Sequence, residues 1–172
     1  MRTWSMVAAV VLAAGVSAAV AASTDIDKFF RVDARVCTGG QPTQPQLAAL
    51  KADGVRGIVN LREPDEPGTI DEPRLAKELG LRYVGIPVKP SAPTDQQVQA
   101  FLAATDDPDL FPAYIHCGSG NRVGAFWMIR RVVVDGWTPE RAEDEAKQIG
   151  LKSPELLTFA RDYVHRHPKR TP

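Results

Sequence analysis

The stretch His116-Cys117-Gly118-Ser119-Gly120-Asn121-Arg122 determines how the whole sequence is interpreted. An apolar run, Ala113-Tyr114-Ile115, comes directly before it and predicts a buried strand, and the apolar residues 123–129 after it predict the start of a buried helix. A glycine-rich loop between a strand and a helix N-terminus forms a cradle for an anion, because loop amides and the helix dipole point at one place. The sequence therefore predicts an anion-binding loop here.

A thiol and a guanidinium stand at the two ends of this loop. Cys117 is expected to lie in the positive field of the helix N-terminus, and that field favours loss of its proton. Arg122 can bind two oxygens of a phosphate or sulfate with its planar fork. The residue types and their order thus favour a reactive thiolate facing a bound oxyanion.

Strand and helix signals alternate along the rest of the chain. Strands are predicted over residues 30–36, 57–61, 81–88 and 113–116. Helices are predicted over 123–134 and after the capping residues Thr43, Asp71, Thr94, Thr138 and Ser153. The alternation predicts an α/β fold with a mostly parallel central sheet of about four to five strands flanked by helices. Ligands of such sheets bind beyond the carboxyl ends of the strands, where the cysteine loop is expected.

The first residues have the pattern of a secretory signal peptide. Arg2 is followed by an apolar run and then by Ala19-Val20-Ala21, a small-x-small cleavage site. Removal of residues 1–22 leaves residues 23–172 as one expected domain, with a frayed basic tail over 166–172. We expect the mature chain in the periplasm or outside the cell, with no stable membrane insertion after cleavage. The alternative is an uncleaved membrane anchor.

Composition excludes several classes of partner. The 172 residues include 21 basic and 21 acidic side chains, so the formal net charge is zero and neither nucleic acid nor an anionic membrane is an expected partner. Besides His116, the histidines are His165 and His167 near the basic tail, so the sequence suggests no metal site and no cofactor.

The chain has two cysteines, Cys37 and Cys117. In an oxidising compartment two thiols invite a disulfide, so a structural bridge is one interpretation of Cys117. Its glycine-rich setting with Arg122 favours a reactive thiol instead. On that interpretation Cys37 is a redox partner that approaches closely enough to bridge Cys117 as an inactive state.

Further blocks of sequence accompany the cysteine loop in a fixed order. They are Cys37-Thr38-Gly39-Gly40-Gln41-Pro42, Ile58-Val59-Asn60-Leu61-Arg62-Glu63 and Gly136-Trp137-Thr138-Pro139-Glu140. Together with His116-Cys117-x-x-Gly120-x-Arg122, this order resembles the bacterial beta-lactamase-hydrolase-like phosphatase family, a branch of the dual-specificity protein tyrosine phosphatase superfamily. The resemblance extends from about residue 30 to 151 and implies a phosphatase-like fold. It also implies a phosphomonoesterase that works through a phosphocysteine intermediate without a metal.

The resemblance assigns roles to the residues of the loop. Cys117 would be the nucleophile, and Arg122 would hold the transferred phosphoryl group. The backbone amides of residues 118–122 would cradle its oxygens, while His116 would lie behind the loop and help to keep the thiol ionised. The loop has four residues between cysteine and arginine where most tyrosine phosphatases have five. Val123 stands where a hydroxyl usually helps to release phosphate.

The general acid is less clear from the sequence. Asp65 and Asp95 are the candidates, because each follows a predicted strand that ends at the ligand-binding edge. Asp95 also has a simpler explanation beside a helix cap, and Asp65, with Glu63 and Glu66, has one as part of a solvated turn.

Two more polar residues are expected to support the site. Arg62 follows a buried strand and either orients an anionic substrate or forms a structural ion pair. Gln41 either donates a hydrogen bond to the cysteine loop or serves only in the turn before Pro42.

Three functions remain open from the sequence. The first is an exported cysteine-dependent phosphatase acting on a phosphorylated protein or a small phosphoester. The second is a rhodanese-like sulfurtransferase with a Cys117 persulfide, since its loop has the same length and residues 61–66 faintly resemble a rhodanese signature. The third is a phosphate- or phosphoprotein-binding module with weak catalysis, which Val123 favours.

Overall fold

A computed structural model describes residues 25–167, and it confirms the predicted α/β class. The elements follow in the order β1 (Phe30–Arg31), β2 (Val36–Gly39), α2 (Gln44–Ala52), β3 (Gly57–Asn60), α3 (Glu72–Glu78), β4 (Arg82–Gly85), α4 (Asp95–Asp106), the 3-10 helix η1 (Pro108–Leu110), β5 (Ala113–His116), α5 (Asn121–Val133), α6 (Pro139–Ile149) and α7 (Pro154–Arg166).

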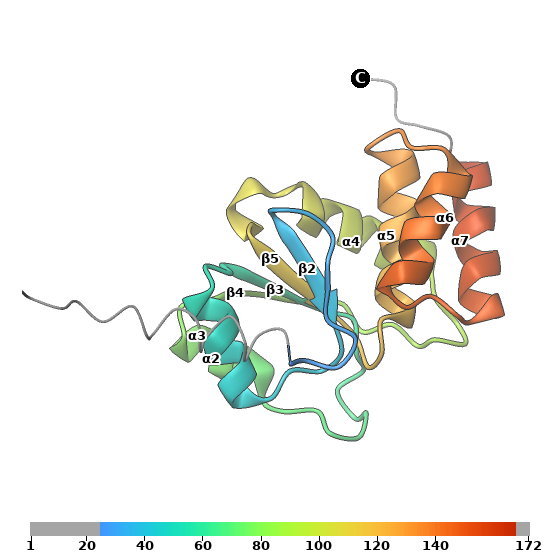
Figure 1. The fold of residues 1–172 in the computed structure, drawn as a ribbon. Helices are drawn as coiled ribbons and strands as arrows, with labels where there is room; N and C mark the ends of the chain where they lie inside the picture. The colour runs from blue at the N-terminus through green and yellow to red at the C-terminus, as the bar shows by residue number, and fades with distance from the viewer. Residues whose placement is uncertain (1–24, 168–172) are drawn as a thin grey trace, which may run out of the picture.

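The sheet has five strands in the order β1-β2-β5-β3-β4 (Figure 1). Strands β2, β5, β3 and β4 are parallel, whereas β1 pairs antiparallel with β2. In the register, His116 lies beside both Gly39 and Asn60. The carboxyl ends of the three central strands are therefore level, and the cysteine loop leaves from the middle one.

The first strand differs from the prediction. Residues 30–36 were expected to form one strand, but β1 and β2 are separated by a tight turn. Within this turn, Asp33 Oδ1 accepts hydrogen bonds from the amides of Arg35 and Val36 at 2.8 and 2.9 Å. An aspartate that binds amides further along its own chain favours a turn over a continuous strand.

Helices cover both faces of the sheet (Figure 1). Helices α4 to α7 share one core with Ala113, Ile115 and Cys117, and α2 and α3 share the other with Cys37 and Tyr114. Successive residues of a strand point to opposite faces, so β5 supplies both cores.

The predicted caps explain where several helices begin. Thr43 and Thr94 form capping boxes with Gln46 and Gln97, in which each side chain pairs with the backbone of the other residue. Asp71, Thr138 and Ser153 also accept hydrogen bonds from backbone amides of the helices that they precede. These starts are set by local chemistry, which is why the sequence identifies them.

Two predicted segments lie mostly outside the described residues. The signal peptide over 1–22 lies wholly outside them, and so does the tail from residue 168. Arg166, which was expected in the tail, is the last residue of α7 and pairs with Asp95 and Asp162 at 2.7 and 2.8 Å. Between residues 25 and 167, no helix is long and apolar enough to cross a membrane.

Candidate active site

The cysteine loop connects β5 to α5, as the sequence predicts. Gly120 caps the helix in the left-handed conformation with φ 83°, and a Cβ there would lie 2.3 Å from the carbonyl oxygen of Ile149. Only glycine fits this position. The next residue, Asn121, uses its side-chain oxygen to accept from the amides of Lys152 and Ser153 at 2.6 and 2.9 Å. Asn121 therefore offers a phosphate its backbone amide, while its side chain anchors the loop to the segment before α7.

Cys117 lies at the bottom of this loop. Its Sγ atom accepts a hydrogen bond from the Gly120 amide at 3.2 Å, and the residue is 1% exposed. Gly118 and Ser119 are exposed, so the rim of the loop is open to solvent above the buried sulfur. The first amides of α5 have no intrahelical acceptor, and they lie at the positive end of the helix dipole. This arrangement directs N–H donors and the positive end of the helix dipole at an oxyanion placed beside the sulfur.

Arg122 is held rigidly from three sides. Its Nη1 donates to the carbonyl oxygens of Leu61 and Val88 at 3.2 and 3.0 Å, and Nη1 and Nη2 both contact the carboxylate of Glu66. Burial works to lower the pKa of Arg122, but the Glu66 hydrogen bond and the Cys117 charge outweigh it, and the pKa is raised. A guanidinium has five N–H donors, so Nε and the second hydrogen of Nη2 remain for a substrate oxyanion.

Glu66 is a positioning group that the sequence did not single out. Hydrogen bonding to Arg122 is the largest effect on its carboxyl and holds the pKa at about 2. The Glu63 amide and Arg62 Nε donate to the same carboxylate at 2.7 and 3.1 Å. A group that is ionised at neutral pH has no proton to give to a leaving group, so Glu66 fixes the arginine and does not act as the acid. The sequence shows it only as one of several carboxylates in a turn.

Arg62 and Gln41 support the site indirectly. Arg62 is 7% exposed and donates to Gln41 Oε1 at 2.8 Å and to the Pro67 carbonyl at 2.6 Å, besides its bond to Glu66. Its donors are thus directed at the protein, which favours the structural alternative over direct substrate binding. Gln41 does not form the predicted bond to the cysteine loop, because its side chain is turned towards Arg62, Pro42 and Glu72.

His116 directly precedes the cysteine and lies in a buried polar cluster. Its Nε2 is 3.0 Å from Glu72 Oε2, and Asn60 Nδ2 donates to the same oxygen at 2.7 Å. Glu72 is 1% exposed and His116 is 0% exposed. The sequence does not identify Glu72 as a site residue. A glutamate that follows a helix cap is already explained by its favourable interaction with the positive end of the helix dipole.

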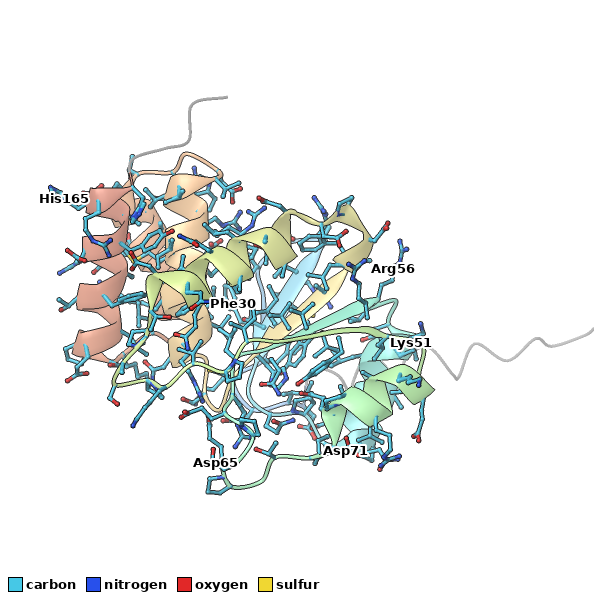
Figure 2. The ribbon with its side chains drawn as sticks, turned by 180° about the vertical axis from the view of Figure 1, so that it is seen from behind. Phe30, Lys51, Arg56, Asp65, Asp71 and His165 are labelled. Atoms are coloured by element: carbon cyan, nitrogen blue, oxygen red, sulfur yellow. The ribbon has the colours of Figure 1, made fainter. Side chains whose placement is uncertain are left out.

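The two candidate acids have different surroundings. Both carboxylate oxygens of Asp95 accept from Arg166, at 2.7 and 3.0 Å, and this pairing lowers the pKa of Asp95. The pairing disfavours Asp95 as a proton donor, and the reason is a contact between α4 and α7 that the sequence does not reveal. Asp65 lies exposed at the outer part of the loop between β3 and α3 (Figure 2). Within residues 25–167 its carboxylate has no hydrogen-bond or ion-pair partner, and it directly precedes Glu66 in the chain.

The predicted approach of Cys37 to Cys117 is wrong. Both thiols are free, and Cys37 is level with Tyr114 in the sheet, three residues before Cys117 on the neighbouring strand. Three residues of strand span roughly 10 Å, which exceeds the roughly 7 Å that a disulfide bridges between Cα atoms. The two side chains also belong to opposite cores. Burial raises the pKa of the Cys37 thiol to about 11, which makes it unreactive.

A groove of about 320 Å³ runs beside the loop. It is lined by Gln41, Pro42, Thr43, Gln44, Arg62, Pro67, Gly68, Ile70 and Gly118. Its position next to Gly118 makes it suitable for the part of a substrate that follows the phosphate. Within residues 25–167, no group of three or more histidine, cysteine or acidic side chains is arranged to hold a metal ion.

Comparison with known proteins agrees with this geometry. The family described as DSP-PTPase phosphatase fused to NAD+ kinase matches residues 2–160. The chain belongs to this family. Membership confirms the predicted placement and makes the domain a phosphoric monoester hydrolase domain of the tyrosine-phosphatase type, in a family that acts on phosphorylated substrates.

The relatives are partial or distant matches. A beta-lactamase hydrolase-like protein of Xylella fastidiosa (strain Temecula1) is 30% identical over 152 residues, which covers 84% of this chain and 33% of the relative. The chain thus spans about a third of that protein's length. A DUF442 protein of Shewanella putrefaciens CN-32 has the same fold with a TM-score of 0.74, 22% identity and coverage of 87% of this chain and 99% of that one. Pseudomonas aeruginosa TpbA gives a TM-score of 0.64 at 21% identity, over 81% and 84% of the two chains.

Proposed function

We propose that this protein hydrolyses a phosphomonoester through a phosphocysteine intermediate on Cys117. The observation that carries the proposal is the placement of Cys117 Sγ under the Gly120 amide, in one short loop with the rigidly held Arg122. A thiolate, a set of amides and a guanidinium then converge on one oxyanion. Electrostatic stabilisation of this kind supplies much of the catalysis in phosphoryl transfer.

In the first step the thiolate attacks phosphorus. The S–P bond forms as the bond between phosphorus and the leaving oxygen breaks, and that oxygen takes a proton from an acid or from water. Charge on the three equatorial oxygens is met by the loop amides and by the free edge of Arg122. Glu66 keeps that edge in place, since it binds the opposite side of the guanidinium.

In the second step water attacks the phosphocysteine, releasing phosphate and restoring the thiolate. Val123 follows the arginine and is 0% exposed, so no hydroxyl at that position assists the water. Ser119 is an exposed residue of the loop, and its hydroxyl is our candidate to substitute. We expect this step to be slow, which predicts a burst of alcohol release before the steady state.

The test compares substrates of two reaction types. Reduced protein should release p-nitrophenol from p-nitrophenyl phosphate, and Cys117→Ser should abolish the release. Formation of thiocyanate from thiosulfate and cyanide, without phosphatase activity, would instead establish the sulfurtransferase. Binding of vanadate or phosphate without turnover would show a binding module. Of the two alternatives to the phosphatase, the binding module is the one that Val123 favours, because valine has no hydroxyl to assist release of phosphate.

Asp65 is our candidate for the general acid. Asp65→Asn should leave turnover of p-nitrophenyl phosphate nearly unchanged, because that leaving group needs no proton. Turnover of phenyl phosphate should fall by about 10²-fold. Asp95→Asn is the matched control, because the Asp95 carboxylate pairs with Arg166. This variant should affect the turnover of both substrates equally. Equal effects of Asp65→Asn on both substrates would remove it from this role.

We also propose that the chain is exported, on the strength of the signal-peptide pattern in residues 1–22. Expression of the full chain in a bacterial host, followed by fractionation and N-terminal sequencing, tests this. A mature protein that begins near residue 23 in the periplasm or medium supports export, and an intact chain in the cytoplasm contradicts it.

A further inference from the structure

The buried carboxylate of Glu72 occupies an unusual position next to the cysteine loop. Glu72 is the first residue of α3, and its partners are the imidazole of His116 and the side-chain amides of Asn60 and Gln41. Burying a carboxylate is costly unless its oxygens are fully hydrogen-bonded. Both oxygens of Glu72 are contacted, Oε2 at 2.7 and 3.0 Å and Oε1 at 3.5 Å.

These contacts belong to a chain of polar side chains that starts and ends at the cysteine loop. We call it the polar ring, and its members are His116, Glu72, Gln41, Arg62, Glu66 and Arg122. Its first member directly precedes the nucleophile, and its last is the phosphate-binding arginine. Glu72 is thus joined to Cys117 through one residue and to Arg122 through three.

The chemistry of the contact fixes the proton on His116. In its ionised form Glu72 can only accept hydrogen bonds, and Nε2 of His116 is then the donor in this contact. Nδ1 of His116 is buried and has no hydrogen-bond partner among the described residues. The imidazole of His116 also stacks on the phenol ring of Tyr114, with the two ring centroids 5.4 Å apart. Glu72 is therefore the group that orients the imidazole, as carboxylates do behind histidine ligands and bases, and it supplies the counter-charge to the protonated form of the ring.

We propose that Glu72 is a positioning residue for both halves of the site. Through His116 it holds the start of the cysteine loop and favours the Cys117 thiolate, and through Gln41 and Arg62 it supports the carboxylate that holds Arg122. The proposal rests on the proposed phosphatase function for its kinetic readout only. The titratable groups around the thiol and Glu72 are Arg122, His116, Glu66, Tyr114 and Tyr83.

The test measures the thiol directly. The rate of Cys117 alkylation by iodoacetamide, followed by peptide mass spectrometry across pH, gives the ionisation midpoint. Glu72→Gln should move this midpoint up by about one pH unit, because a buried imidazole without its counter-charge loses its proton and stops favouring the thiolate. Below the midpoint, alkylation should be about tenfold slower. In p-nitrophenyl phosphate hydrolysis, kcat should fall with a similar pH shift.

Two variants separate positioning from mere folding. Glu78→Gln removes one carboxylate from the same helix, where Glu78 is exposed and pairs with Arg74, and should leave the midpoint unchanged. In a His116→Asn background, Glu72→Gln should have no further effect on the midpoint, since Glu72 acts on the thiol through His116. An unchanged or lowered midpoint in Glu72→Gln, or additive effects in the double variant, would overturn the proposal.

The wild-type protein supplies a test that survives if Glu72→Gln does not fold. The chain has three histidines, so the ¹⁵N spectrum of their imidazoles is simple to assign. Nε2 of His116 should carry a proton, and a proton on Nδ1 alone would refute the role of Glu72. Both this spectrum and the alkylation profile still test the role of Glu72 if the wild type does not hydrolyse phosphate esters, because neither measurement depends on turnover. Failure of the proposed function is thereby distinguished from failure of this inference.

Discussion

Both ends of α5 carry arginines, buried at the N-terminal end and half-buried at the C-terminal end, but only the N-terminal end forms the candidate active site. At the N-terminal end, Arg122 is fixed by two carbonyls and Glu66, with part of its fork still available. At the C-terminal end, Arg131 binds Glu145 at 2.7 and 3.0 Å and Asp135 at 2.9 Å. Arg130 also binds Asp135, at 2.6 Å.

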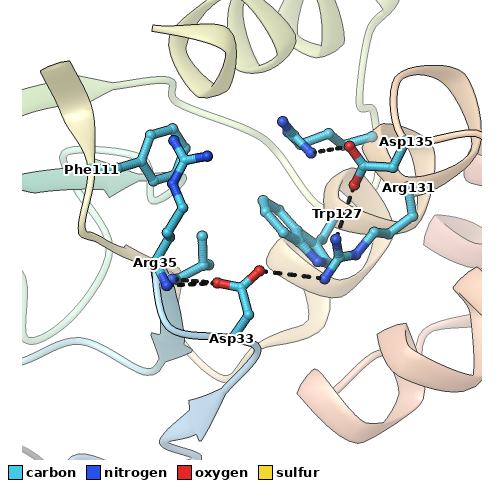
Figure 3. Close-up of a pocket in the computed structure, with 8 residues that line it drawn as sticks. Asp33, Arg35, Phe111, Trp127, Arg131 and Asp135 are labelled. Carbon is cyan, nitrogen blue, oxygen red and sulfur yellow. Dashed lines mark hydrogen bonds and ion pairs between the residues drawn. The ribbon is translucent and has the colours of Figure 1, made fainter. Parts of the chain in front are cut away.

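The C-terminal end borders a second cavity, of about 170 Å³ (Figure 3). Its walls combine Arg35 stacked over Phe111 at 4.3 Å with Arg131 over Trp127 at 4.9 Å. Asp33 and Asp135 project into the same space and approach Arg131 (Figure 3). The carboxylates balance the arginines there, and the helix dipole at that end repels an anion. Arginines that line a cavity are therefore not enough to make a phosphate-binding site. The N-terminal end of α5 differs because it also has the loop amides and the Cys117 thiol.

The largest expected effect separates the two ends by chemistry. Arg122→Lys should lower kcat for p-nitrophenyl phosphate by roughly 10²- to 10³-fold, because a lysine cannot hold two phosphate oxygens and Glu66 in one plane. Steady-state kinetics measure the loss, and circular dichroism checks that the fold is kept. A variant with near-wild-type kcat would show that the N-terminal arginine is as structural as its counterparts at the other end.

At the C-terminal end we expect a loss of stability instead. Arg131→Ala removes the ion-pair partner of Glu145, which keeps its hydrogen bond from Trp127 Nε1, and it removes the stack on Trp127. The free energy of unfolding should therefore fall by about 2 kcal/mol. Urea denaturation measures this. The kcat of the folded fraction should stay the same, and Arg74→Ala, which breaks exposed pairs on α3, is the control with little effect on either quantity. A tenfold loss of kcat in Arg131→Ala would show coupling along α5.

The remaining effect concerns the acid range and is a change of slope. The pKa of Glu66 is lowered from 4.5 to about 2 in the folded protein, so its contribution to stability is present above pH 4.5 and is lost as the pH falls towards 2. Glu66→Gln should therefore flatten the fall in stability between those values, by up to about 1.4 kcal/mol per pH unit. Urea midpoints across pH give the slope. Equal slopes in both proteins would mean that the carboxylate is not held by Arg122 in solution.

Much of the fold could be predicted because its signals are local. Strand β5, the glycine loop and the start of α5 follow from a short stretch of sequence, and Thr43 and Thr94 mark helix starts through contacts within a few residues. The same locality identified Cys117 and Arg122, since loop and helix place both in one cradle. The division of residues 30–36 into two strands depended on an aspartate turn that an apolar pattern does not reveal.

The sequence alone therefore determined the class of fold, the position of the thiol and the guanidinium, and the family. Tertiary structure decided which of many carboxylates serve the site, because strand order and register bring β3 and the turn after it against β5. Glu66 thus reached Arg122, Glu72 reached His116, and Asp95 was drawn to Arg166 instead. Register also put Cys37 and Cys117 into opposite cores. Contacts between residues distant in sequence depend on the pairing of strands and the packing of helices, and a single sequence does not encode that pairing in any local pattern.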